Sequence, residues 1–272
     1  MNRVFDYRAA TSFAEALGWL AEMGSNARPL AGGTDLLVNV RAGLMTPGCV
    51  IDLKQIPEIT ALSFDENEGL LIGAGVTINE IIESDAVQQH YPLLAICAHQ
   101  LASHQVRNRA TVVGNIVNAS PCADMAPPLL CLQAEIEIQG NDGARWVPCA
   151  TFFTGAKQTI LKPGELVSRI RVPAATKGAR GGYKKLKRIQ GHDLGIVGVA
   201  LVLLGDTVHI AVSSAAATPV LVKPFARTDD LSTVVATVRE AISPIDDVRC
   251  TKDYRLFMAE TYVKRLWQEV VA

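Results

Sequence analysis

The sequence is poor in the features that assign a chain to a membrane, to nucleic acid or to the secretory pathway. No stretch approaches the roughly 20 uninterrupted apolar residues that a membrane span needs, and the longest apolar run, residues 196–204, has the length of a strand. Residues 1–8 carry charges and lack the apolar core of a signal peptide. The formal net charge of −1 offers no attraction to nucleic acid or to an anionic membrane. We therefore expect a soluble, cytoplasmic protein with neither kind of partner.

Motifs for metals and protein nucleophiles are lacking too. The sequence has no Walker A, HExxH or GxSxG motif, so no catalytic residue can be named. Its cysteines include no CxxC pair and no metal-ligand spacing, which predicts no metal site, no iron–sulfur centre and free buried thiols. Those cysteines are Cys49, Cys97, Cys122, Cys131, Cys149 and Cys250. Any redox chemistry must then come from a bound cofactor that the protein positions.

What the chain does have is enough apolar sequence for real cores, at 49% hydrophobic residues. Its 272 residues exceed one average domain. Apolar periodicity and turn residues predict an α+β fold in three parts. We expect a small α/β unit at residues 1–55, a second unit at 56–173, a Gly/Lys/Arg-rich linker at 174–182, and an antiparallel sheet with helices at 183–272.

The expected elements follow from the same periodicity. The first unit reads as helix–strand–helix–strand, and in the second Thr77 caps a helix with Glu80 in the capping-box position. A helix at 92–103 would place Leu93, Leu94, Ile96, Cys97 and Leu101 on one apolar face, and residues 111–128 read as a loop region. Expected strands lie at 59–64, 69–73, 135–138, 146–148, 183–188, 197–204 and 207–213, and further helices at 231–241 and 253–271.

A first glycine segment follows the expected strand at residues 28–30. Glycines let the backbone turn tightly and approach a ligand closely, since no Cβ intrudes. The helix that follows directs unpaired N–H groups back at the turn, which suits a diphosphate. A plain Gly-Gly turn in which Thr34 caps a helix is the interpretation that spacing alone favours. The candidate binding residues are Ala31, Gly32, Gly33, Thr34, Asp35 and Leu36.

A second segment, residues 107–124, is dense in small hydroxyl, amide and glycine positions. Such residues suit a backbone wrapped round a polar ligand, and Asp124 could accept a hydrogen bond from a sugar hydroxyl. The alternative is a structural loop whose Asn and Ser side chains satisfy their own backbone. The candidates here are Thr111, Gly114, Asn115, Ser120 and Asp124. A third run, Gly73-Ala74-Gly75, lacks the rest of a dinucleotide fingerprint and is interpreted as a structural turn.

A basic cluster, Lys184, Lys185, Lys187 and Arg188, lies on an expected strand. Alternation along a strand would place Lys185 and Lys187 on the face opposite Lys184 and Arg188. The cluster is either a solvated face or the source of one cation that faces a cofactor.

These segments, in this order along the chain, resemble the FAD-binding, or medium, subunit of the xanthine dehydrogenase and carbon monoxide dehydrogenase family of molybdenum hydroxylases. The resemblance covers nearly the whole chain. The segment from Ala31 to Leu37 resembles the family's first diphosphate loop, and residues 107–124 resemble its second, usually written T-(I/V)-G-G-N. Val113 replaces the first glycine of that pair, so the pattern assigns the backbone hydrogen bonds to Gly114 and Asn115. Further matching blocks begin at Ile51, Ile72, Pro163, Tyr183 and Pro244.

The resemblance implies a two-subdomain FAD-binding module of the PCMH type followed by an α+β C-terminal domain. FAD would lie with its diphosphate on Gly32–Asp35 and on Gly114, Asn115 and Ser120. Asp124 would hold the ribityl or ribose part, and Leu166 and Lys185 would lie near the isoalloxazine. It also implies an iron–sulfur subunit with 2Fe–2S clusters and a molybdopterin subunit as partners, and electron transfer through FAD to NAD or another soluble acceptor.

Two other functions remain open at this point. A self-contained FAD-dependent oxidase would need a substrate pocket with a base over the flavin, and the sequence offers none. A degenerate, non-catalytic scaffold subunit would fit the substitution at Val113. The hydroxylated substrate, the electron acceptor and the oligomeric state of the complex are not encoded in any readable motif.

Overall fold

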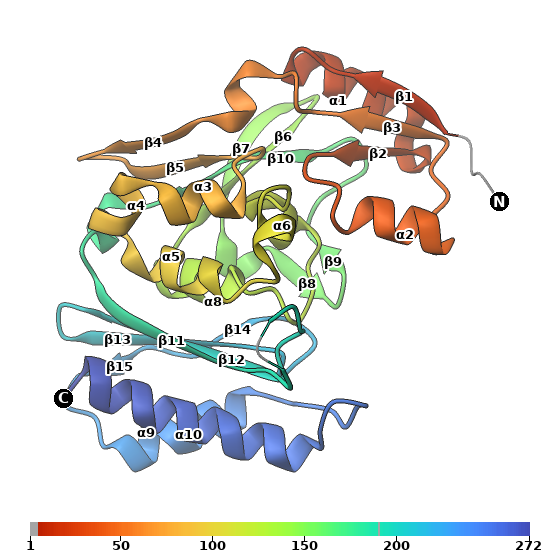
Figure 1. Cartoon of the computed structure of the whole chain (residues 1–272). Coiled ribbons are helices and arrows are strands. Elements are labelled where there is room, and N and C mark those ends of the chain that lie inside the picture. Colours follow the sequence, from red (N-terminus) through yellow and green to blue (C-terminus); the bar gives the residue numbers. More distant parts are fainter. Residues whose placement is uncertain (1–4, 190) are drawn as a thin grey trace.

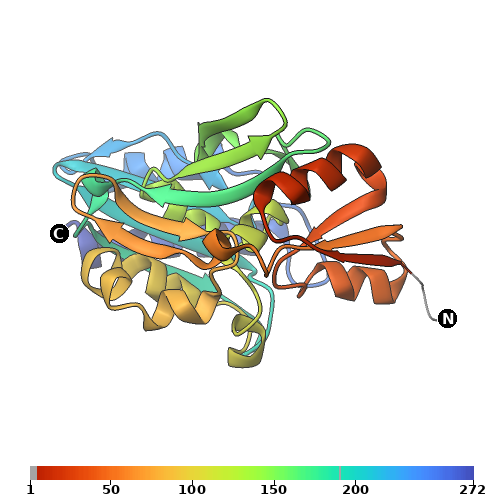
Figure 2. The same ribbon diagram turned by 90° about the horizontal axis from the view of Figure 1, so that it is seen from above.

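The computed structural model describes residues 5–189 and 191–272 and arranges them in three larger sheets with helices packed on their faces (Figure 1). Along the chain these are a small parallel sheet, a five-stranded antiparallel sheet and a C-terminal antiparallel sheet. Viewed from above, the first unit lies to one side of the middle unit (Figure 2). The α+β class expected from the sequence is confirmed.

The first unit is a parallel sheet in the order β1-β3-β2. Strand β3 lies in the middle and all four of its residues are buried. Helix α1 begins where Ser12 Oγ accepts a hydrogen bond from the Glu15 N–H. The expected helix–strand–helix–strand order is confirmed, but it is preceded by the unpredicted strand β1, whose charged residues show no apolar pattern. The elements are β1 (Asp6–Ala9), α1 (Phe13–Met23), β2 (Ala27–Leu30), α2 (Leu36–Ala42) and β3 (Cys49–Asp52).

The middle unit is an antiparallel sheet in the order β4-β5-β10-β6-β7. Its central strand, β10, is formed by Leu166–Val172, which no expectation placed in a strand. The other strands are β4 (Leu62–Asp65), β5 (Gly69–Gly73), β6 (Glu135–Gly140) and β7 (Gly143–Pro148). The strand expected at residues 59–64 begins only at Leu62, because Pro57–Thr60 forms a 3₁₀ turn. A separate hairpin joins β8 (Phe153–Gly155) and β9 (Gln158–Thr159).

Short helices cover this sheet, and the predicted capping box between Thr77 and Glu80 is confirmed. Two expectations are wrong. The helix expected at 92–103 ends at His99, and Ile96 within it lies 42% exposed rather than on the buried face. The loop expected at 111–128 contains α7 and α8, which are too short to show a helical period. The helices are α3 (Ile78–Glu83), α4 (Asp85–His90), α5 (Pro92–His99), α6 (His104–Arg107), α7 (Val112–Val117) and α8 (Ala126–Cys131).

The C-terminal unit has the predicted three strands, with a hairpin turn at Gly205, where φ is 59°. Strand β11 starts at Arg180, inside the stretch expected to be a linker. The elements are β11 (Arg180–Leu186), β12 (Val197–Leu204), β13 (Thr207–Ser213), β14 (Val220–Leu221), β15 (Phe225–Ala226), α9 (Leu231–Ala241) and α10 (Lys252–Val270). No helix in the described part of the chain combines the length and the apolar character needed to cross a membrane.

Strand β12 separates two hydrophobic cores. Ala200 and Val202 pack into the core shared with the helices of the middle unit, whereas Val199 and Leu201 pack into the core beneath α9 and α10. Figure 1 shows the sheet as a layer between these two groups of helices. Because strand side chains alternate between the two faces, one apolar strand serves both cores.

The cysteines divide into buried and accessible thiols. Burial raises the pKa of Cys97 and Cys131, and it raises the pKa of Cys149 to about 12. Cys122 and Cys250 are only partly buried. We expect a thiol-specific disulfide reagent at neutral pH to modify these two in the folded protein and all six after unfolding, because reaction needs an accessible thiolate. Rapid modification of Cys97 or Cys131 in the native protein would contradict the packing described here.

Candidate functional site

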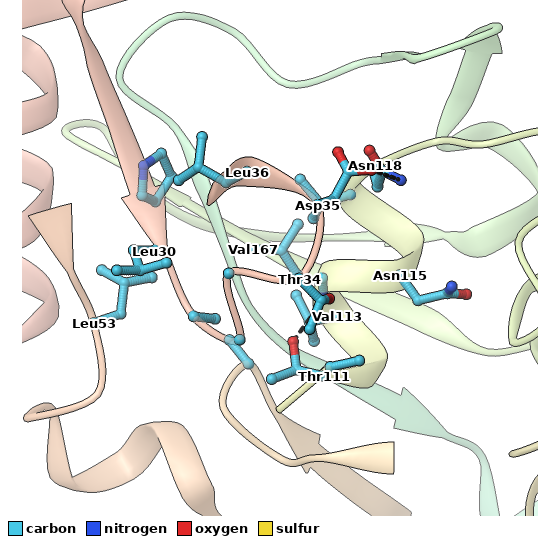
Figure 3. Close-up of a pocket in the computed structure, with 18 of the residues that line it drawn as sticks. Leu30, Thr34, Asp35, Leu36, Leu53, Thr111, Val113, Asn115, Asn118 and Val167 are labelled. Carbon is cyan, nitrogen blue, oxygen red and sulfur yellow. Dashed lines mark hydrogen bonds between the residues drawn. The ribbon is translucent and has the colours of Figure 1, made fainter. Parts of the chain in front are cut away.

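A cleft of about 300 Å³ lies between the first unit and the middle unit (Figure 3). One wall is the loop between β2 and α2, and the facing wall is the segment that leads into α7. The start of β10 and the residues before it close the third side. Of the predicted binding residues, those that line the cleft are Ala31, Gly32, Gly33, Thr34, Asp35, Leu36, Thr111, Gly114, Asn115 and Leu166.

The two glycines of the first loop have different roles. A Cβ on Gly32 would lie 1.9 Å from the backbone carbonyl oxygen of Arg109, so only glycine lets the two loops meet. Gly33 has φ of 73°, a left-handed conformation that glycine adopts without strain. A Cβ there would meet the side chains of Leu30 and Leu37. Because Gly32 and Gly33 have no side chains, the two loops can pack against each other, and the backbone of the first loop is also left accessible to a ligand.

The second loop is held by hydrogen bonds at its start. Thr111 Oγ1 accepts from the Gly114 N–H at 2.9 Å, which caps α7. The Ile78 N–H donates to the Ala110 carbonyl, also at 2.9 Å. Val113, which stands where the family pattern has glycine, lies inside α7 and is buried. A helical backbone accepts any L-residue, so the valine imposes no strain.

A polar cluster that the sequence analysis missed supports this loop from behind. The Asn79 side chain is buried, and its Oδ1 accepts from Arg107 Nε at 3.1 Å. Its Nδ2 donates to Asn108 Oδ1, and Arg107 Nη1 donates to the Leu101 carbonyl at 2.8 Å. These bonds fix the turn that presents the Arg109 carbonyl to Gly32. An asparagine two residues after a helix cap gave no sequence signal for this role.

At the outer rim of the cleft, three polar side chains from separate elements meet. Asn118 Nδ2 donates to Asp35 Oδ1 at 3.3 Å, as Figure 3 shows. Lys157 Nζ donates to Asn118 Oδ1 at 2.7 Å and lies 3.6 Å from Asp35 Oδ1. The first loop, the end of α7 and the β8–β9 hairpin are thus connected by side chains. Lys157 and Asn118 were not among the predicted residues.

On the inner wall, Glu165 and Leu166 carry the chain into β10. Glu165 forms a bidentate ion pair with Arg145, which holds the pKa of Glu165 below its ordinary value.

In the run Gly73-Ala74-Gly75, which the sequence analysis interpreted as a structural turn, a Cβ on Gly73 would lie 2.3 Å from the Ile59 carbonyl oxygen. Gly73 is therefore needed for close backbone packing, which supports its interpretation as a structural turn. The next residue, Ala74, nevertheless lines the cleft.

Three predicted residues, Ser120, Asp124 and Lys185, do not line the cleft. Lys185 Nζ lies 2.8 Å from the Asp124 carboxylate and donates to the Gln100 carbonyl at 3.1 Å. The Tyr183 hydroxyl donates to Asp124 Oδ1 at 3.2 Å. Burial raises the pKa of Asp124 against the opposing effects of Lys185 and Tyr183. A role of these residues in ligand binding stays a prediction.

The strand alternation expected for the basic cluster is seen at its first two members. The Lys185 side chain is 2% exposed and points into the protein, whereas Lys184 pairs with Glu269 of α10 at 2.8 Å. Arg188 pairs with Asp193 in the following loop and lowers the pKa of that carboxyl to about 2. Lys185 therefore lies inside the protein, and the other cations of the cluster lie at the surface.

Comparison with known proteins supplies the family. A family model described as "FAD binding domain in molybdopterin dehydrogenase" matches residues 3–175. The chain belongs to this family. It is an oxidoreductase subunit with an FAD-binding domain, and the match includes both loops of the cleft.

The whole chain is similar to medium subunits of molybdenum-containing dehydrogenases. It is 36% identical to the carbon monoxide dehydrogenase medium chain of Hydrogenophaga pseudoflava, over 96% of this chain and 95% of that protein. It is 29% identical to the xanthine dehydrogenase FAD-binding subunit of Escherichia coli O157:H7, over 98% and 96%. A chain of the reconstituted carbon monoxide dehydrogenase from Oligotropha carboxidovorans superposes with a TM-score of 0.93, at 30% identity and 99% and 98% coverage.

Proposed function

We propose that the chain holds FAD in the cleft and passes electrons through it to a soluble acceptor. The observation that carries the proposal is the direct meeting of the two glycine loops, where Gly32 leaves no room for a Cβ against Arg109. The diphosphate would lie against Gly32, Gly33 and Thr34 on one side. Gly114 and Asn115 would face it on the other.

The residues present suit such a ligand. Each loop leads into the first turn of a helix, α2 or α7, where N–H groups can donate to diphosphate oxygens. The Gly114 N–H, which donates to Thr111 Oγ1, and the Leu37 N–H, which donates to the Gly33 carbonyl, are not among them. Leucine and valine side chains line the rest of the cleft and would exclude water from a flavin ring. These are Leu30, Leu36, Leu53, Leu101, Val106, Val113, Val117, Leu161, Leu166 and Val167. When bound, FAD would supply the capacity to accept electrons one at a time and to release them singly or as a hydride.

The proposal extends to ligand contacts outside the cleft lining. Ser120 would bind near the diphosphate, Asp124 the ribityl or ribose hydroxyls, and Lys185 the region of the isoalloxazine. The division into units at 1–55, 56–173 and 183–272, joined by 174–182, belongs to the same proposal. In this division, FAD contacts come from every unit.

We further propose that the chain works in a complex. Relatives are named as medium chains and FAD-binding subunits, which supports partner subunits that carry 2Fe–2S clusters and molybdopterin. Electrons would enter FAD from the iron–sulfur subunit and leave to NAD or another acceptor in the cytoplasm. The substrate would be hydroxylated in the molybdopterin subunit, outside this chain.

The test is an absorbance spectrum of the purified chain, followed by chromatography of the cofactor released on denaturation. We expect FAD in a one-to-one ratio, reduction of a dye by NADH, and no stoichiometric iron. Turnover of a substrate with oxygen by the isolated chain would favour a self-contained oxidase instead. Failure to take up FAD even after reconstitution would favour a scaffold subunit and refute the proposal.

A further inference from the structure

The β8–β9 hairpin extends from the middle unit to the rim of the cleft and presents Lys157 there. This residue has φ of 60°, a left-handed conformation that is uncommon for a residue other than glycine. Its N–H donates to the Ala119 carbonyl at 2.9 Å, which anchors the tip of the hairpin just beyond α7. The backbone of Lys157 is thus held in place, and the fold of the hairpin directs its ammonium group toward Asn118 and Asp35.

The contacts of Lys157 converge on the first glycine loop. Its Nζ is 2.7 Å from Asn118 Oδ1 and 3.6 Å from Asp35 Oδ1, and Asn118 Nδ2 is itself 3.3 Å from Asp35 Oδ1. Asp35 also accepts a hydrogen bond from Asn39 in the first turn of α2, at 2.9 Å. The carboxylate therefore has a lysine and two amides around it, from three separate segments.

Asp35 creates an electrostatic conflict with the proposed ligand. The inference rests on the proposed function, in which the diphosphate lies on the loop of Gly32–Asp35. A diphosphate carries negative charge, and like charges within a few ångströms repel one another. A carboxylate on the same loop therefore opposes binding unless a cation offsets it. Lys157 is the cation that the hairpin holds beside Asp35.

We propose that Lys157 is a positioning residue for FAD, which acts by offsetting the charge of Asp35 and by tying the first loop to Asn118. It does so without binding the phosphates itself. The Lys157 and Asp35 side chains are 53% and 49% exposed, so the pair alone adds little to stability. Its role is to set the charge and the position of the loop at the moment FAD binds.

The experiment is a fluorescence titration of the full-length apo chain with FAD, at low and high salt. Lys157→Met should raise the dissociation constant for FAD about fivefold at low salt. A fivefold change corresponds to the free energy of a typical surface ion pair. Most of this difference should disappear at high salt, where exposed charges are screened. Lys157→Arg should bind within about twofold of the unaltered chain, since it keeps the charge. Lys223→Met, which removes an exposed cation from the C-terminal unit, is the control and should bind normally.

The double variant separates the proposed role from a direct one. With Asp35→Asn already present, Lys157→Met should change the affinity little, because no carboxylate remains to be offset. An equal loss in both backgrounds would mean that Lys157 binds the phosphates directly, and would overturn the inference. An unchanged affinity in Lys157→Met would overturn it as well. Failure of the unaltered chain to bind FAD would instead refute the proposed function.

Discussion

Lys185→Met is expected to lower the free energy of unfolding by about 3–5 kcal/mol, the usual cost of leaving one member of a buried ion pair alone. The Lys185 and Asp124 side chains are 2% and 10% exposed, and their charged atoms are 2.8 Å apart. Without the lysine, the Tyr183 hydroxyl is the one side-chain partner that the carboxylate keeps among the described residues. Urea denaturation of the full-length chain measures the loss.

Two further variants make this prediction specific. Lys184→Met removes the neighbouring cation, whose pair with Glu269 is partly exposed, and should cost no more than about 1 kcal/mol. Combining Lys185→Met with Asp124→Asn should recover much of the loss, because no unpaired carboxylate is left. A loss as large in Lys184→Met as in Lys185→Met would show that burial of the Asp124 pair is not the cause.

The dependence of this loss on pH has a definite sign. Burial already raises the pKa of Asp124 in the folded protein, and removal of Lys185 should raise it further. A carboxyl whose folded pKa lies above its unfolded value favours the folded state most where it is protonated. The deficit of Lys185→Met should therefore be full at neutral pH and shrink as the pH falls through the folded pKa. A deficit that grows on acidification would contradict the assignment.

The second large effect is expected from Gly32→Ala. The added Cβ would lie 1.9 Å from the Arg109 carbonyl oxygen, whereas non-bonded carbon contacts need about 3.5 Å. One loop must therefore move away from the other. Forced backbone shifts of this kind cost about 1–3 kcal/mol, so FAD affinity should fall roughly 5- to 150-fold. Titration of the apo variant with FAD measures the change.

Gly18→Ala provides the matched control, because a Cβ on Gly18 in the middle of α1 meets no atom within 4 Å. It should leave FAD binding unchanged and stabilise the helix by up to about 1 kcal/mol. If Gly32→Ala bound FAD as well as this control, the contact between the two loops would not be what shapes the site.

The sequence was most informative where a local rule acts alone. The capping box at Thr77 and Glu80, the turn at Gly205 and the apolar strand β12 all follow from short patterns, and the structure contains them. The first glycine segment was also predicted to connect a strand to a helix, and it lies between β2 and α2, whereas its binding of a diphosphate stays a prediction. Strand β10 was missed although Arg169 and Arg171 alternate with buried apolar residues as in a strand; the two arginines pair with Glu137 and Glu135 of β6.

The parts of the site that escaped prediction depend on contacts distant in the sequence. Lys157 meets Asp35 across more than a hundred residues, and Asn79 reaches Arg107 from a different helix. Nor does any local pattern show that Gly32 opposes Arg109. Lys185 was predicted as a cofactor neighbour from the family resemblance, and its pairing with Asp124 became visible only when the two segments were seen together.

The placement of β12 has a consequence for how the chain holds together. Its alternate residues belong to different cores, with Ala200 and Val202 on one side and Val199 and Leu201 on the other. Unfolding of this strand would expose both cores at once, so we expect the C-terminal sheet to unfold together with the middle unit. The sheet is therefore the centre of a single cooperative folding unit, and a split of the polypeptide between β11 and β12 would divide that unit.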